Sequence, residues 1–146
     1  MGRYVVLALV LAGLLVALAC DEAVQKGTIT GTVKDGGQPV NGAYVLLLDE
    51  GELVQGNTPL SNGSITLGNG SYTIVMVEPN KNYYVAAVKD QDGNGNYTPG
   101  VDPIGYYGTL NQQTGVWIPA SIHVGEGQKL SGINVNDLMV IPIPIP

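Results

Sequence analysis

The chain has 146 residues, a net charge of −6 and a single cysteine, so no disulfide can form within it. Its few lysines are spread singly and form no basic patch, which makes nucleic acid and anionic lipid headgroups poor candidates as partners. The length corresponds to one domain, and the abundance of glycine, proline and β-branched residues is typical of a β-sandwich.

The first 19 residues have the organisation of a secretory signal. Arg3 supplies the positive charge, residues 4–18 form an uncharged apolar run, and the small residues Ala17 and Ala19 flank the cleavage zone. Because the apolar run is shorter than the ~20 residues that span a bilayer, a permanent transmembrane helix is disfavoured. We therefore expect residues 1–19 to be a helical signal peptide.

Cys20 follows this segment directly, and its position indicates how the segment is processed. A free exposed thiol is unusual in a secreted protein, whereas attachment of lipid is a chemical use that fits this position. The segment resembles a bacterial lipoprotein signal, in which a fatty acid such as palmitate is attached to the cysteine and the chain is cut just before it. It departs from that pattern at Ala17, where Leu, Val or Ile is typical, and the alternative is an ordinary signal peptide cleaved near Ala19.

The lipoprotein interpretation has a consequence for location. It predicts that Cys20 anchors the chain to a bacterial membrane in the cell envelope and that the domain lies outside the cytoplasm. Residues 20–26 then form a short polar tether. The anchor implies the membrane as one partner. No sequence motif identifies the protein or glycan that the domain itself binds.

The remainder of the chain has the periodicity of β-strands. Residues 27–34 alternate strictly, with Ile29, Gly31 and Val33 on one face. Further strands are expected over residues 42–49, 70–77, 83–89, 122–124 and 132–135, and weaker ones near residues 53–54 and 64–67. No stretch after the signal has a helical period. We therefore predict an all-β fold, a single antiparallel β-sandwich over residues 27–138, followed by a proline-rich tail over residues 139–146.

Three segments of this domain resemble a known module. They are Gly-Thr-Val with Gln-Pro-Val-Asn-Gly-Ala-Tyr-Val over residues 31–45, Asn-Gly-Ser-Tyr-Thr-Ile over residues 69–74, and Leu-Ser-Gly-Ile-Asn-Val over residues 130–135. They are similar to segments of carboxypeptidase regulatory-like domains, which have a transthyretin-like (prealbumin-like) sandwich. The resemblance implies a non-catalytic structural or interaction module in the periplasm or on the cell surface.

An acidic loop over residues 90–102 is the candidate metal site. Asp90, Asp92 and Asn94 occupy the first, third and fifth positions of an EF-hand-like loop, and Gly95 occupies the sixth, where such a loop turns sharply. Acidic and amide oxygens at alternate positions can converge on a hard cation such as calcium.

The loop departs from an EF-hand at its end. Val101 stands where a bidentate glutamate is required, Asp102 follows one residue late, and no helix is expected on either side. The sequence therefore predicts a calcium loop of looser geometry, and the alternative is a glycine-asparagine turn with solvated acidic side chains. The candidate ligands are Asp90, Asp92, Asn94, Asn96 and Asp102.

The sequence contains no residue set typical of an enzyme. His123 is the only histidine and is expected in mid-strand, and Ser121 lacks the surroundings of a nucleophile elbow. We therefore expect no catalytic activity.

Tyr106, Tyr107 and Trp117 form a second candidate site. Their surroundings are glycine-rich and are expected to be loop-like, and exposed aromatic rings commonly contact ligands such as sugars. This pattern supports an alternative function, a glycan-binding surface lipoprotein that uses loop aromatics. The other interpretation of such residues is that one or more of them pack inward.

Overall fold

The computed structural model describes residues 23–142, so Cys20, the expected signal helix and residues 143–146 lie outside the described part of the chain. The described part is all-β, which confirms the predicted fold class. The strands are β1 (Gly27–Thr32), β2 (Lys34–Asp35), β3 (Gln38–Pro39), β4 (Tyr44–Asp49), β5 (Gly63–Ile65), β6 (Ser71–Val77), β7 (Lys81–Val88), β8 (Pro103–Tyr106), β9 (Gly108–Asn111), β10 (Val116–Pro119), β11 (Ile122–Val124), β12 (Lys129–Leu130) and β13 (Met139–Val140). Within residues 23–142 no helix is long and apolar enough to cross a membrane.

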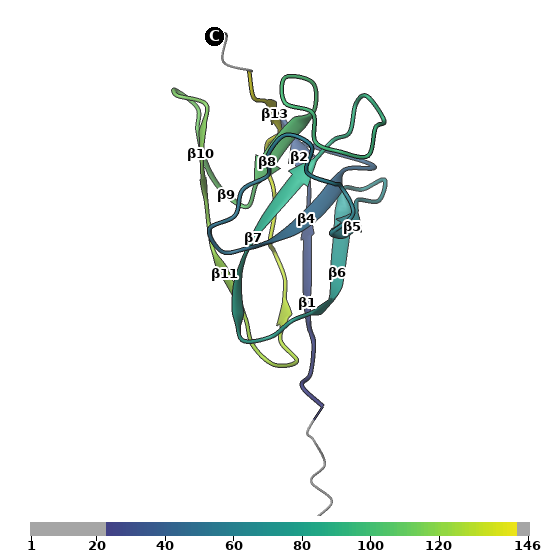
Figure 1. The fold of residues 1–146 in the computed structure, drawn as a ribbon, viewed down its shortest axis with the longest axis vertical. Helices are drawn as coiled ribbons and strands as arrows, with labels where there is room; N and C mark the ends of the chain where they lie inside the picture. The colour runs from purple at the N-terminus through teal and green to yellow at the C-terminus, as the bar shows by residue number, and fades with distance from the viewer. Residues whose placement is uncertain (1–22, 143–146) are drawn as a thin grey trace, which may run out of the picture.

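The strands form two layers (Figure 1). The larger sheet has the order β13-β8-β7-β4-β5, and β11 also pairs with β7. The smaller sheet has the order β12-β1-β6, with β1 antiparallel to β6 and parallel to β12. Within residues 23–142, β9 and β10 pair only with each other and form a projecting hairpin. β2 and β3 form a second, shorter hairpin. The start of β1 and the end of β13 lie at opposite ends of the molecule.

The alternation of β1 places its apolar side chains between the two layers. Ile29 and Val33 are fully buried there, as predicted from their spacing. Gly31 lies between them, where the backbone of Ile133 passes so close that a Cβ atom would meet its carbonyl oxygen at 1.9 Å. Glycine is therefore required at this position, because the chain from Leu130 to Val135 packs directly against β1.

The larger sheet is apolar on both faces. The inner face and the smaller sheet enclose one cluster, which includes Ile29, Val33, Val45, Tyr72, Ile74, Val85, Ala87, Val124 and Val135. The outer face carries a second cluster, which consists of Leu46, Leu48, Leu60, Ala86, Val88, Tyr97, Ile104 and Tyr106. Leu60 and Tyr97 belong to loops, so the second cluster is covered by connecting segments rather than by a further sheet.

The structure differs from the expected strands in several places. Residues 53–54 are not in a strand, and residues 132–135 contribute an isolated bridge between Val33 and Val135. β9 and β10 were not expected, and β8 includes Tyr106, which was expected in a loop. β13 pairs with β8, so the sheet extends two residues past the predicted domain boundary at Leu138.

Candidate functional site

The acidic loop joins β7 to β8 at the end of the sheet opposite to the start of β1 (Figure 1). Its base is closed where the Lys89 amide donates to the Pro103 carbonyl at 2.9 Å. Glycines with positive φ at 93, 95 and 100 allow the chain to reverse direction within a few residues. The loop is therefore a compact excursion fixed at both ends by strand pairing.

Asp102 is the buried anchor of this loop. Its side chain is fully buried, with one carboxylate oxygen accepting from the Gln91 amide at 2.8 Å and the other from the Thr98 amide at 2.7 Å. A buried carboxylate is tolerated where hydrogen bonds of this kind replace its hydration. Asp102 thus ties the first residues of the loop to the last.

Asp90 organises the first turn of the loop. Its two carboxylate oxygens accept from the Gly93 amide at 2.7 Å and from the Gly95 amide at 3.0 Å. Partial desolvation favours the neutral form of Asp90, but the hydrogen bonds from Gly95, Gly93 and other groups outweigh it and lower the pKa below its usual value of 3.8. The loop therefore favours the ionised carboxylate.

Asp92 lies beside these two carboxylates. It accepts from the Asn94 amide at 3.1 Å, from the Asn94 side-chain nitrogen at 2.9 Å and from the Thr98 hydroxyl at 2.9 Å. Thr98 therefore contacts Asp92 through its side chain and Asp102 through its backbone. Thr98 was not expected in the site, and its place four residues before Asp102 is a weak sequence signal.

The three carboxylates converge. Asp90, Asp92 and Asp102 each offer an oxygen, and these three oxygens lie within 4.8 Å of one another. The side chains of Asn94 and Asn96 behave differently from these carboxylates. The side-chain oxygen of Asn94 accepts from the Asn96 backbone, and its side-chain nitrogen is directed toward Asp92. The Asn96 side chain donates to the Asn94 carbonyl. Three of the five residues expected as ligands thus present carboxylate oxygens together, and such oxygens suit a hard cation.

A second loop holds the acidic loop against the outer cluster. Asn57 donates to the Tyr97 carbonyl, Tyr97 donates to the Thr58 carbonyl, and Leu60 donates to the Gly95 carbonyl, all within 2.8–2.9 Å. Tyr97 is buried in the outer cluster between the two loops. The position of the carboxylates is therefore coupled to the packing of the outer face.

The aromatic residues expected as a second site are not gathered on one exposed surface. Tyr106 is only 5% exposed, and its hydroxyl oxygen accepts from the Val54 amide at 3.1 Å. Trp117 packs edge-on against Tyr106, with ring centroids 6.2 Å apart. Tyr107 packs instead against the inner cluster.

Trp117 has one unusual feature. Its indole nitrogen is buried and has no hydrogen-bond partner among residues 23–142. Trp117 lies on the β9–β10 hairpin, which pairs with no other strand in the described part of the chain. An N–H group in this state is destabilising, and an acceptor that reached it would remove the penalty.

His123 lies exposed on β11. Its Nδ1 atom is 2.8 Å from the side-chain oxygen of Asn82 on the adjacent strand. This contact is a cross-strand pair on a solvated face.

Comparison with known proteins gives one match. A family profile described as "Protein of unknown function (DUF1416)" matches residues 13–98, more than half of the 146 residues. The matched span includes β1 to β7 and ends at Thr98, before Asp102 and β8. Neither a curated protein nor a solved structure matches the chain.

Proposed function

We propose that this chain, which belongs to the DUF1416 family of proteins of unknown function, is a lipid-anchored, non-catalytic binding or structural module of the bacterial cell envelope. The observation that carries the proposal is the position of Cys20, directly after an apolar run and seven residues before Gly27, where β1 begins. An extended chain covers at most ~3.6 Å per residue, so a lipid on Cys20 holds the start of β1 within roughly 25 Å of the membrane.

The anchor is tested by Cys20→Ser in the full-length chain. We expect the wild-type protein to partition with membranes and to incorporate a palmitate analogue, and the Cys20→Ser protein to be soluble and unlabelled. Ala17→Leu, which restores the typical lipoprotein pattern, is the matched control and should remain membrane-bound. Membrane association of Cys20→Ser at the wild-type level would contradict the proposal.

We further infer a carboxypeptidase regulatory-like, prealbumin-like domain. The segments that carry the resemblance fall on related parts of the fold: residues 31–33 end β1, residues 69–74 turn into β6, and residues 130–135 lie beside β1. The two-layer arrangement supports such a module. Its role is then to present loops and edges to partners rather than to carry out a reaction.

The acidic loop is proposed to bind calcium as a structural ion. The support is the convergence of three carboxylates, each fixed by hydrogen bonds that leave further lone pairs free. Bound calcium stabilises the folded state by mass action, so we expect the melting temperature to rise with calcium and to fall with EDTA.

Two variants test the calcium site. Asp92→Asn keeps the size of the side chain and removes its charge, and should abolish the calcium-dependent shift. Glu52→Gln removes an exposed carboxylate outside the loop and should leave the shift unchanged. Identical melting curves of the wild-type protein in calcium and in EDTA would overturn the calcium proposal without affecting the lipid anchor.

Glycan binding is the alternative function, favoured by the unpartnered indole nitrogen of Trp117. A sugar hydroxyl is an acceptor that could satisfy this nitrogen if the hairpin moved. Tryptophan fluorescence against a glycan panel, with and without calcium, tests this proposal because Trp117 is the only tryptophan. A sugar that binds the wild-type protein and fails to bind Trp117→Phe in calorimetry supports the alternative, and no response to any glycan contradicts it.

A further inference from the structure

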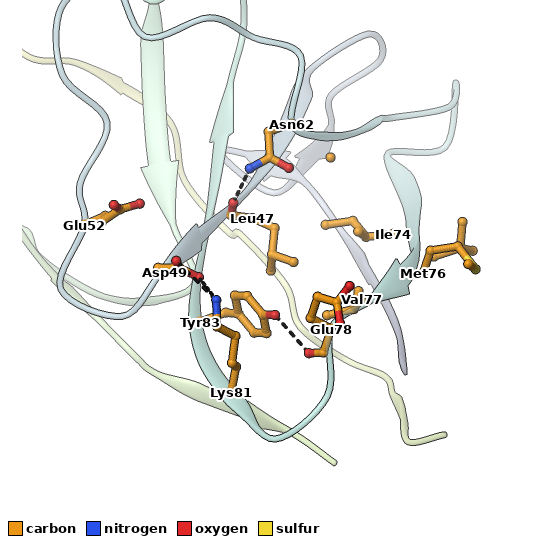
Figure 2. A pocket seen from close by; sticks show the side chains of 12 residues that line it. Leu47, Asp49, Glu52, Asn62, Ile74, Met76, Val77, Glu78, Lys81 and Tyr83 are labelled. Atoms are coloured by element: carbon orange, nitrogen blue, oxygen red, sulfur yellow. Dashed lines mark hydrogen bonds and ion pairs between the residues drawn. The ribbon is translucent and has the colours of Figure 1, made fainter. Parts of the chain in front are cut away.

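One side of the sandwich ends in two free strand edges. β5 pairs only with β4, and β6 pairs only with β1, within residues 23–142. Both strands lie on the same side of the molecule (Figure 1). A groove of about 450 Å³ opens between the two layers here, and Figure 2 shows Leu47 and Asp49 on one wall and Ile74, Val77 and Glu78 on the other.

The free edge of β6 carries backbone groups available for pairing. Val33 donates to the Gly70 carbonyl, so in this antiparallel ladder Tyr72 and Ile74 direct their backbone groups toward β1. Thr73 and Val75 therefore direct theirs away from β1, toward solvent. Neither residue makes a further backbone hydrogen bond in the described part of the chain. Two N–H groups and two carbonyls are thus presented in strand geometry.

This edge lacks two of the features that commonly block strand addition, charge and proline, and its bulge lies only at its end. Residues 64–77 contain no charged residue and no proline. Val75 and Met76, at the end of this edge, have 62% and 70% of their surface exposed. Met76 also has a positive φ of 59°, which ends the regular ladder at a bulge beside Val77. The uncharged stretch is therefore a short, exposed and apolar pairing edge.

The groove beside this edge is lined by both apolar and acidic side chains. Ile74, Val77 and Tyr83 line it and are almost fully buried. Its carboxylates are Asp49, Glu52 and Glu78, and its only lysine is Lys81.

The ion pairs leave an excess of negative charge at the groove. Lys81 pairs with Asp49 at 3.2 Å, and Lys26, from outside the groove, pairs with Glu78. Glu52 makes no ion pair within residues 23–142. The groove thus suits side chains that are apolar or positively charged.

We propose that β6 binds an extended segment of a partner protein by strand addition, and that this segment alternates apolar residues with lysine or arginine. Thr73 and Val75 supply the main-chain hydrogen bonds, and the groove accepts alternate side chains. A second copy of this chain is a poorer occupant, because it brings a net charge of −6 to an acidic groove. The proposal is independent of the lipid anchor and of calcium.

The test uses residues 21–146, which contain both apolar clusters complete. The probe is a short acetylated peptide that alternates lysine with valine, added to ¹⁵N-labelled protein. We expect the amide signals of Thr73 and Val75 to shift on binding and to become protected from hydrogen exchange. A glutamate-valine peptide, or the lysine-valine peptide N-methylated along one edge, should bind at least about tenfold more weakly.

A charge-neutralising variant gives a second readout. Glu52→Gln should weaken binding of the lysine-valine peptide by about twofold, as expected for an exposed ion pair. Glu126→Gln, which changes an exposed glutamate of the β11–β12 loop, is the matched control and should bind as the wild type does.

Three outcomes would overturn the proposal. The first is equal binding of the glutamate and lysine peptides, and the second is the absence of shifts at Thr73 and Val75. The third is a concentration-dependent dimer, seen by light scattering, in which Thr73 and Val75 are protected without peptide. That result would assign the edge to a second copy.

Discussion

The two faces of the larger sheet are buried in different ways. The inner face packs against β1 and β6, so its cover is itself a hydrogen-bonded sheet. The outer face is covered by loops and by the β9–β10 hairpin, which are held by side-chain carboxylates and single backbone bonds. One sheet can therefore have a core on one face that follows from strand periodicity and a core on the other face that depends on hydrogen bonds within loops.

The first prediction concerns the inner face and has the largest expected effect. Ile29→Ala removes a fully buried side chain from between the layers and should lower the free energy of unfolding by about 2–5 kcal/mol. Chemical denaturation of residues 21–146 measures this change. An effect below about 1 kcal/mol would show that the inner face is not the main core.

The second prediction concerns the outer face. Asp102→Ala removes a fully buried carboxylate and leaves the part-buried amides of Gln91 and Thr98 without their acceptor, and should cost about 2–4 kcal/mol. Amide exchange should accelerate in residues 90–102 and in the loop around Thr58 before it does in β1. Uniform acceleration across both sheets would mean that the two faces unfold as one unit, and the contrast between them would be lost.

The third prediction has the smallest effect and concerns pH. The folded-state pKa of Asp90 lies below its usual 3.8, so its contribution is present above that value and is lost as the pH falls through the folded pKa. An NMR titration should show the Gly93 and Gly95 amide signals moving with a midpoint below the usual 3.8 of an aspartate. In Asp90→Asn this transition should be absent, and a midpoint at or above the usual value would contradict the hydrogen-bond geometry.

The sequence predicted the inner face well because, in a strand, the alternation of apolar and polar residues shows which side chains point inward. Ile29 and Val33 follow that rule, and the acidic loop was found from the spacing of its carboxylates. The cover of the outer face was not predicted. The continuous apolar run over residues 45–48 indicates a strand buried on both sides, but nothing in its pattern identifies Tyr97 and Leu60 as the cover of Leu46 and Leu48.

Two glycines explain why Tyr106 was expected in a loop but lies buried in β8. Gly105 and Gly108 gave residues 103–108 the composition of a loop, so Tyr106 was expected to be exposed. In the structure a Cβ atom on Gly105 would lie 2.1 Å from the Asp137 carbonyl oxygen, and one on Gly108 would lie 2.3 Å from that of Ile118. These glycines permit close packing of β8 and β9 against neighbouring backbone. Composition alone does not distinguish such a glycine from a turn glycine.

The arrangement of the chain ends has a mechanical consequence. β1 begins at one end of the molecule and β13 ends at the other, so a pull between these two points acts along the strands (Figure 1). β1 is bonded on both sides, to β6 and to β12, by hydrogen bonds that run across the direction of pull. Such bonds must be sheared together rather than opened one after another. A domain built this way resists extension when a force is applied at the start of β1.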